Sequence, residues 1–163
     1  MVINLTIRIR KAEKKDAGKL SELLITIAQL HHEGRPDIYG AGGAKYNISD
    51  VEKKIADTNE IILVAVDEND TVMGYTMSAI IDVEENGILL PYRKLYIDDV
   101  CVDSSARKLG IGRKLMDATK KKAEELNCHI VELNVWAFNE SAVEFYKSCG
   151  MSVQRMYMEY VLD

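Results

Sequence analysis

Cysteine and proline are both scarce in this sequence, with three cysteines and two prolines among 163 residues. Because Cys101, Cys128 and Cys149 are widely spaced and form no Cys-x-x-Cys pair, they predict neither a disulfide framework nor a zinc site. Free cysteines fit a reducing cytoplasm. With 47% hydrophobic and 29% charged residues, the composition is that of a folded globular chain rather than a disordered or fibrous one.

A long apolar run and an excess of basic residues are also absent. No run approaches the roughly 20 apolar residues of a membrane-spanning helix. The alternating amino terminus lacks the charged lead and apolar stretch of a secretory signal. The formal net charge of −5 argues against nonspecific nucleic-acid binding, which needs clustered Lys and Arg. We therefore predict a cytoplasmic protein with no membrane and no nucleic-acid partner, and the charge is compatible with a cationic partner.

Hydrophobic periodicity predicts alternating strands and helices in one domain, residues 1–163. An alternating segment from Ile3 to Ile9 predicts a first strand, Asp16 is expected to cap the next helix, and Ser49 a short second helix. The other predicted elements are strands at 61–66, 72–81 and 95–102, a helix at 110–126, a strand at 130–136, a helix at 139–149, and short strands at 152–154 and 157–161. This order predicts an α/β fold with a mixed sheet flanked by helices.

The most informative segment is the turn from Arg107 to Gly112, between a predicted strand and a predicted helix. Because glycine lacks a Cβ, Gly110 and Gly112 allow a sharp turn and a close approach to a ligand. Free backbone N–H groups at the helix start and the helix dipole both favour an anion there. The turn therefore predicts a diphosphate site with Arg107 close by. For an isolated Gly-x-Gly, a purely structural connection would be the alternative.

Two other phosphate motifs fit this turn poorly. A P-loop needs Gly-x-x-x-x-Gly-Lys-Ser/Thr, and a dinucleotide fingerprint needs glycine where Leu115 stands. The turn instead resembles the Arg/Gln-x-x-Gly-x-Gly/Ala pattern of the GNAT superfamily of N-acetyltransferases, with Lys108 where many members carry a further glycine. The resemblance extends from Leu95 to Met151 and includes Asn139 and Tyr146. Within the superfamily, the small bacterial-type polyamine and amine acetyltransferases are the most similar in pattern.

The resemblance implies a GNAT-like α/β fold, with a mixed, largely antiparallel sheet, and acetyl-coenzyme A (acetyl-CoA) as co-substrate without a metal. In this family the strand ahead of the turn holds the pantetheine arm, the turn holds the pyrophosphate, and an asparagine further along contacts the coenzyme. The cofactor-binding residues so implied are Val100, Cys101, Val102, Arg107, Lys108, Leu109, Gly110, Ile111, Gly112 and Asn139.

Aminolysis of a thioester needs a neutral amine, a polarised carbonyl and a proton for the leaving sulfur. Tyr146 is the candidate proton donor, because a phenol with a pKa near 10 can donate to a thiolate whose conjugate acid has a pKa near 8.5. The family's tyrosine stands at this position, and packing against the core is the alternative. A backbone N–H near Val100 or Val102 would polarise the carbonyl.

Two acids, Asp98 and Asp99, interrupt the apolar strand, and burying them requires a compensating environment. Because side chains alternate along a strand, we expect them on opposite faces. Polyamine acetyltransferases of the superfamily carry an acidic pair here. We therefore predict Asp98 as the general base and Asp99 as a group that attracts a cationic acceptor. Two solvated acids near a strand end are the alternative.

Residues 31–47 form a glycine-rich segment long enough to be functional. We expect it to line the acceptor pocket, with Glu33, Tyr39 and Tyr46 as candidate substrate-binding residues. The two histidines at its start are adjacent and lack the i, i+4 spacing of a zinc helix, so no metal site is predicted. Trp136 and Phe138 are predicted to be packing residues.

These features predict an N-acetyltransferase that moves acetyl directly from acetyl-CoA to a primary amine of a small cationic acceptor in a ternary complex. No cysteine lies in a setting that would activate it as a nucleophile. Two alternatives stay open, a protein or peptide N-acetyltransferase and a non-catalytic acyl-CoA-binding sensor. The resemblance also allows a homodimer.

Overall fold

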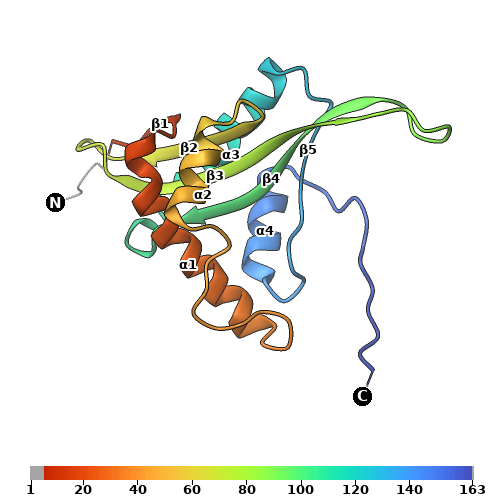
Figure 1. Ribbon diagram of the computed structural model, residues 1–163, viewed down its shortest axis with the longest axis horizontal. Coiled ribbons are helices and arrows are strands. Elements are labelled where there is room, and N and C mark those ends of the chain that lie inside the picture. Colours follow the sequence, from red (N-terminus) through yellow and green to blue (C-terminus); the bar gives the residue numbers. More distant parts are fainter. Residues whose placement is uncertain (1–5, 163) are drawn as a thin grey trace.

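A five-stranded sheet runs through the computed structural model, which describes residues 6–162 (Figure 1). The strands lie in the order β1-β2-β3-β4-β5, antiparallel throughout except for the parallel pair β4 and β5. They are β1 (Arg8–Lys11), β2 (Glu60–Val66), β3 (Val72–Val83), β4 (Tyr92–Val102) and β5 (Ile130–Leu133). The helices are α1 (Ala17–Gly34), α2 (Ile48–Ala56), α3 (Ile111–Glu125) and α4 (Glu140–Ser148).

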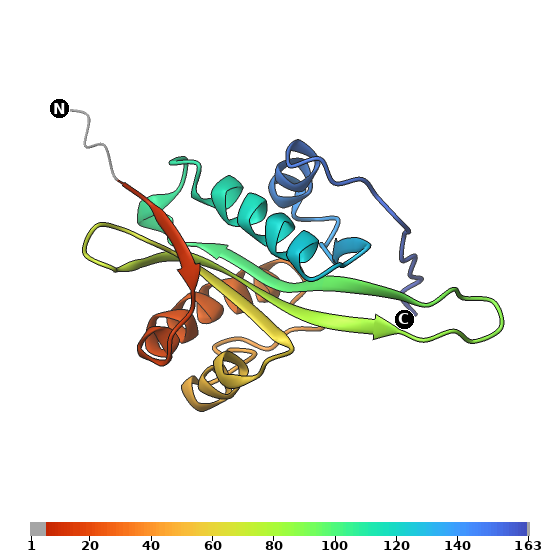
Figure 2. The same cartoon turned by 90° about the horizontal axis from the view of Figure 1, so that it is seen from above.

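Helices cover both faces of the sheet, with α1 and α2 on one side and α3 and α4 on the other (Figure 2). On the first face, Leu24 of α1 and Val51 of α2 pack with Tyr75 of β3 in one buried cluster. On the second face, Leu115 and Met116 of α3 are fully buried. The observed single α/β domain with a mostly antiparallel sheet confirms the predicted fold class. None of the helices within residues 6–162 has the length and apolarity needed to cross a bilayer.

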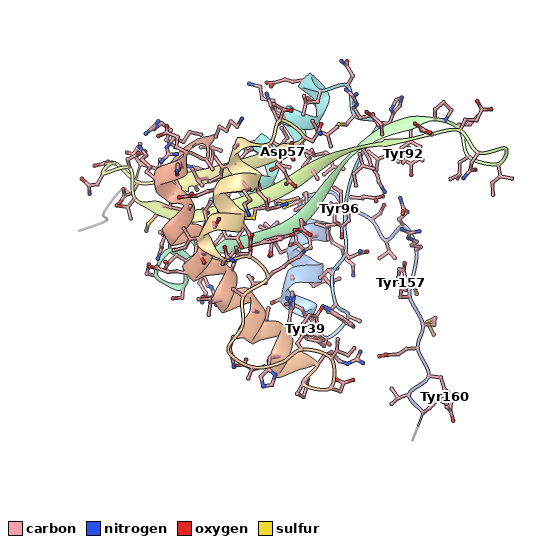
Figure 3. All side chains as sticks on the ribbon, viewed as in Figure 1. Tyr39, Asp57, Tyr92, Tyr96, Tyr157 and Tyr160 are labelled. Atoms are coloured by element: carbon pink, nitrogen blue, oxygen red, sulfur yellow. The ribbon has the colours of Figure 1, made fainter. Side chains whose placement is uncertain are left out.

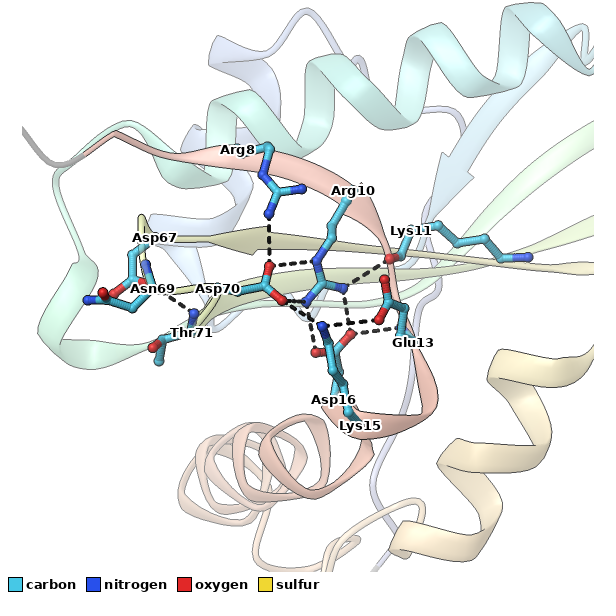
Figure 4. Close-up of polar contacts among 10 residues, drawn as sticks. All are labelled: Arg8, Arg10, Lys11, Glu13, Lys15, Asp16, Asp67, Asn69, Asp70 and Thr71. Atoms are coloured by element: carbon cyan, nitrogen blue, oxygen red, sulfur yellow. Dashed lines mark hydrogen bonds and ion pairs between the residues drawn. The ribbon is translucent and has the colours of Figure 1, made fainter.

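A network of ion pairs ties β1 to the turn between β2 and β3 and to the start of α1 (Figure 4). Asp16 does not cap α1 with its side chain as predicted. Its carboxylate instead accepts two hydrogen bonds from Arg10, at 2.7 and 3.0 Å, and one from the Glu13 N–H at 2.7 Å. Asp70 accepts hydrogen bonds of 2.7 to 3.1 Å from three basic side chains, which are Arg8, Arg10 and Lys15. Asp16 therefore pairs with Arg10 and closes a local capping box with Glu13 at the 3₁₀ turn Lys14–Asp16, instead of capping α1.

Other boundaries also differ from the sequence prediction. Asn47, not Ser49, caps α2, because its side chain accepts a hydrogen bond from the Asp50 N–H at 3.0 Å. β5 ends at Leu133 instead of residue 136. Residues 152–162 form no strand and run away from the body of the domain, although two strands were predicted there (Figures 1 and 2). The predicted first strand is observed only as β1, and Ile3 lies outside the described residues.

Candidate active site

The turn before α3 has the geometry of an anion site. Gly110 precedes the helix with a φ of 73°, in the left-handed region, and no side chain caps the helix start. The N–H groups of Ile111, Gly112 and Arg113 therefore lack intrahelical partners. A Cβ placed on Gly110 would meet nothing within 4 Å, so the turn faces open space, while the Ile111 side chain is buried and anchors α3 to the sheet.

Two residues of the turn play parts that the sequence did not reveal. Lys108 has a φ of 64°, in the left-handed region. This backbone conformation is less favourable for a residue with a Cβ than for glycine. The observation gives a physical reason for the glycine that many family members carry at this position. Gly112 permits close packing of α4, because a Cβ there would lie 3.0 Å from Cζ of Phe145. The second glycine of the motif is thus needed for helix contact as well as for any ligand.

Strands β4 and β5 part beside this turn. Their pairing runs only from Lys94 to Ile97 on β4, opposite Ile130 to Leu133 on β5. Beyond Ile97, the edge of β4 that faces β5 has no partner strand within residues 6–162. The segment Val100–Val102, predicted to hold the pantetheine arm, lies along this open edge. An extended ligand could therefore hydrogen-bond there as an additional strand would.

The prediction that Asp98 and Asp99 lie on opposite faces is wrong, because β4 carries a bulge. Met77 of β3 pairs with Asp99 and Ser78 with Ile97, so Asp98 is an extra residue between two paired positions. A bulge allows two successive side chains to share a face. Asp98 reaches the loop before α2, and Asp99 pairs with Met77, which belongs to the core under α1 and α2. Both acids therefore face the α1 and α2 side.

The two acids have different surroundings. Asp98 accepts a hydrogen bond from Lys45 at 2.5 Å and another from the Tyr46 hydroxyl at 2.9 Å. The side chain of Asp99 is half-buried, and its desolvation raises the pKa of the carboxyl to about 7, with the charge of Asp98 adding to the rise and that of Lys45 opposing it. Asp98 is thus a paired carboxylate, whereas Asp99 has a pKa suited to accepting a proton near neutral pH.

Tyr75 adds an unpaired polar group to this buried side. Its ring is fully buried, and its hydroxyl has no hydrogen-bond partner among the described residues. Burial, followed by the charge of Asp99, raises the pKa of this phenol. Because a buried hydroxyl without a partner is costly, this position favours a bound water or a ligand group close to Asp99.

Tyr146 of α4 packs where the two strands part, in a cluster with Val100 of β4 and Leu133 of β5. Burial raises the pKa of Tyr146 to about 12, and the charge of Asp99 adds to the rise. The phenol is protonated at neutral pH. Cys101 is not a competing nucleophile, because burial raises the pKa of its thiol to about 12.

An aromatic cluster joins the loop after α1 to the loop after β5. Trp136 Nε1 donates a hydrogen bond to the Tyr39 hydroxyl at 3.1 Å, and the Tyr39 ring lies 5.0 Å from His31. Phe138 stacks on Trp136 and packs so closely on Gly34 that a Cβ there would lie 2.1 Å from its ring. Trp136 and Phe138 are packing residues, as predicted, and the Tyr39 hydroxyl accepts from Trp136 while its own O–H group stays available as a donor.

Two predicted ligand residues lie elsewhere or are already engaged. Glu33 lines a groove of about 490 Å³ that reaches the phosphate turn, together with Ile25, Thr26, Ile27, Gln29, Leu30 and Arg107. Asn139 caps α4, since its Oδ1 accepts from the Ala142 N–H at 3.3 Å and from the Ser141 hydroxyl at 3.2 Å. Only its amide nitrogen is left to meet a coenzyme. Residues 6–162 hold no group of three or more side chains able to bind a metal.

The resemblance implied a strand, a glycine turn and a helix in succession, and β4, the turn at Gly110 and α3 follow one another in this order. Residues 25–151 match the acetyltransferase (GNAT) family, and the chain belongs to it.

Relatives and solved structures agree with this assignment. The chain is 31% identical over 102 residues to the catalytic subunit naa20 of the N-terminal acetyltransferase B complex of Schizosaccharomyces pombe, covering 60% of this chain and 53% of that protein. It is 34% identical over 92 residues to the mycothiol acetyltransferase of Propionibacterium freudenreichii, and this match covers 56% of this chain and 28% of that protein. The chain thus spans about half or less of these curated relatives. A mutant of the BH1408 protein of Bacillus halodurans superposes with a TM-score of 0.91 at 28% identity, covering 95% of this chain and 99% of that one.

Proposed function

We propose that this protein transfers the acetyl group of acetyl-CoA to a primary amine by direct attack within a ternary complex. One observation carries the proposal: β4 and β5 part beyond Ile97, with Tyr146 packed at the opening and Asp99 on the stretch of β4 that follows. The pKa of Asp99, raised to about 7, and that of Tyr146, raised to about 12, suit a proton acceptor and a proton donor. Membership of the acetyltransferase family supports the same reaction. A cytoplasmic location fits the free cysteines and is part of the proposal.

The unpaired N–H groups at the start of α3 would hold the pyrophosphate of the coenzyme, with Arg107 nearby. The pantetheine arm would then run along the open edge of β4 at Val100–Val102, which directs the thioester toward Tyr146. The coenzyme itself supplies the activated acetyl group. What this chain contributes is the anchoring of the diphosphate, the alignment of the arm and the movement of two protons.

Asp99 is a better general base than Asp98. Asp98 already pairs with Lys45 and Tyr46, so removing a proton from an ammonium there would require those contacts to rearrange. Asp99 has no such ion pair, and its pKa of about 7 suits exchange with an amine, directly or through a water held by the Tyr75 hydroxyl. Asp98 would then orient the loop that carries Lys45.

In the reaction, the neutral amine attacks the carbonyl carbon of the thioester and gives one proton to Asp99. The carbon–sulfur bond breaks, and the leaving sulfur receives a hydrogen bond or a proton from Tyr146. Because the pKa of Tyr146 is about 12 and that of a thiol is about 8.5, complete transfer is unfavourable for the isolated pair. The phenol would therefore act mainly by stabilising the developing charge on sulfur.

The acceptor is proposed to be a small molecule with a primary amine. A cationic acceptor is supported by Asp98 and Asp99 on one face, although Lys45 offsets the charge of Asp98. Peptide amino termini are the second candidate, since the relative naa20 is the catalytic subunit of an N-terminal acetyltransferase complex. Polyamines, aminoglycosides, amino acids and peptides should therefore be compared as acceptors.

The test is a thiol-release assay with acetyl-CoA and these amines, followed by a pH profile of kcat/KM with the best acceptor. We expect activity to rise with pH through about 7, because Asp99 must lose its proton in the free enzyme. Asp99→Asn should remove this rise, the acidic limb of the pH profile, and lower kcat by about 10²-fold. The matched control, Asp98→Asn, should keep the limb. Loss of the limb in Asp98→Asn alone would return the base role to Asp98.

Asp99 also gives a readout that does not depend on activity. Its pKa is higher in the folded state than in the unfolded chain, so the folded protein binds more protons and loses stability as pH rises from about 4 to 7. Asp99→Asn should therefore be more stable than the parent at neutral pH. If the protein binds CoA in calorimetry but turns over no amine, the acyl-CoA sensor is the correct reading.

A further inference from the structure

Lys45 brings a primary amine of this chain into the candidate site. Its Nζ donates a hydrogen bond to Asp98 at 2.5 Å and lies 5.3 Å from the centre of the Tyr46 ring. Among residues 6–162, no other lysine side chain pairs with Asp98 or with Asp99. The site that we propose for the amine of an acceptor therefore already holds an amine that belongs to the protein.

Lys45 lies near the end of an open connection between α1 and α2. Figure 3 labels Tyr39 on this connection, and the Tyr39 ring lies 5.0 Å from His31 of α1. A Cβ placed on Gly40 or Gly43 would meet nothing within 4 Å, so the backbone ahead of Lys45 is not tightly packed there. The Lys45 side chain is 50% exposed. Because its stem is also flexible, the ammonium can change partners at little steric cost.

The amine is close to the stretch of β4 along which the thioester would be aligned. Asp99 follows Asp98 directly, and Val100, the first residue proposed to align the pantetheine arm, is two positions from Asp98. A strand rises about 3.3 Å per residue, so these two positions span about 7 Å at most. Rotation about the single bonds of the lysine stem moves Nζ over a comparable distance.

We propose that the chain acetylates its own Lys45 when acetyl-CoA is bound and no acceptor amine is present. The inference rests on the proposed function, because it uses the same coenzyme and the same proton acceptor. The Lys45 ammonium first loses one proton to solvent through Asp99. The neutral Nζ then attacks the carbonyl carbon of the thioester, and a carbon–nitrogen bond forms as the carbon–sulfur bond breaks. The second nitrogen proton goes to Asp99, and CoA leaves as a thiolate stabilised by the Tyr146 hydroxyl.

The surroundings of Lys45 set the rate of this reaction and its consequence. Burial lowers the pKa of Lys45, but the hydrogen bond and the charge of Asp98 outweigh it, so the pKa lies above its usual value. A neutral Nζ is therefore rare at neutral pH, and the modification should be slow. Acetylation removes the positive charge and with it the ion pair, and Asp98 then keeps the hydrogen bond from Tyr46.

The test incubates the purified chain with acetyl-CoA and no added amine, and follows the intact mass and the modified peptide by mass spectrometry. We expect one acetyl group per chain, located on Lys45. Because the amine is tethered to the site, the rate per chain should not depend on protein concentration. Lys45→Arg keeps the positive charge and should remove the modification. The matched control is Lys54→Arg, since Lys54 lies over the same Tyr46 ring at 4.8 Å but pairs with Glu60, and it should leave the modification unchanged.

A second variant separates assisted transfer from unassisted chemical acetylation. Asp99→Asn should slow the modification of Lys45 by about 10²-fold, because the site loses its proton acceptor. An equal rate in Asp99→Asn would overturn the proposal, as would acetyl groups on exposed lysines such as Lys11 in place of Lys45. A rate per chain that rises with protein concentration would also overturn it, because the acceptor would then belong to another copy.

The outcome for added amines distinguishes this inference from the proposed function. If small amines or peptides are acetylated while Lys45 stays unmodified, self-acetylation is wrong and the proposed function stands. If neither Lys45 nor any added amine is acetylated although the chain binds CoA, the proposed function fails, and the self-acetylation that rests on it fails as well.

Discussion

The two edges of the sheet are built in opposite ways. At the β1 edge, Asp16 and Asp70 gather the basic side chains of β1 into a closed network, and the side chains of Asp16 and Arg10 are only 4% and 11% exposed. At the β5 edge the strand is short, its pairing with β4 ends at Ile97, and the following apolar segment is uncovered. The comparison teaches that the charged side chains of the β1 edge find their partners within the chain, where they contribute to stability. At the β5 edge, the stretch of β4 beyond Ile97 has no partner strand on this side among residues 6–162.

Asp16→Ala should have the largest effect on the stability of the β1 edge. It would leave the mostly buried Arg10 and the Glu13 N–H short of a partner, so we expect a loss of about 3 kcal/mol in the free energy of unfolding. Denaturant unfolding measures this loss, with Glu22→Ala, which removes an exposed i, i+3 pair, as the control expected to cost under about 0.5 kcal/mol. Equal costs for the two variants would contradict the closed network.

Tyr146→Phe tests the opening between β4 and β5, and it should lower the activity without lowering the stability. We expect kcat to fall about 10²-fold, because the sulfur loses its hydrogen-bond donor, while the packing against Val100 and Leu133 is kept. Turnover with the best acceptor and CoA affinity by calorimetry measure the two parts. Unchanged kcat would remove Tyr146 from the reaction.

Gly112→Ala should lower both the free energy of unfolding and kcat, each to an intermediate degree. The added Cβ would lie 3.0 Å from Cζ of Phe145, so this ring must move by a few tenths of an ångström. We expect a cost of about 1 to 3 kcal/mol in stability and a fall in kcat, because Tyr146 is the next residue of α4. The control, Gly18→Ala in α1, has nothing within 4 Å and should gain up to about 1 kcal/mol. A fully active Gly112→Ala would show that α4 is not held by this contact.

Lys108→Gly should have the smallest effect. Glycine relieves the left-handed φ of 64°, a gain of about 1 kcal/mol, but its greater freedom in the unfolded chain cancels much of it. The net change in the free energy of unfolding should stay under about 1 kcal/mol and should be stabilising. A clear destabilisation would mean that the Lys108 side chain makes a contribution that its backbone conformation does not explain.

The sequence predicted the parts of the molecule whose signals are local. Gly110 and Gly112 predicted a sharp turn before α3, and the left-handed φ of 73° at Gly110 confirms that turn, because this backbone conformation is a local requirement. Anion binding by the turn stays a prediction. The apolar alternation of β2 to β4 and the helical periodicity of α3 likewise predicted the fold class. Asp16 and Ser49 were predicted as caps from the residue types expected at helix starts. The Asp16 carboxylate pairs with Arg10 instead, and Asn47 caps α2 because the helix begins at Ile48, before Ser49.

The sequence by itself determined the order of elements from the first strand to α4, the glycine turn and the presence of two adjacent acids on β4. Only the tertiary structure decided that a bulge turns Asp98 and Asp99 to one face and that Lys45 pairs with Asp98. It also decided that Glu33 lines the same groove as Arg107 of the glycine turn. The reason is physical. Periodicity and turn chemistry depend on neighbours in the chain, whereas register, burial and charge pairing depend on residues that meet only when the sheet and its helices are assembled.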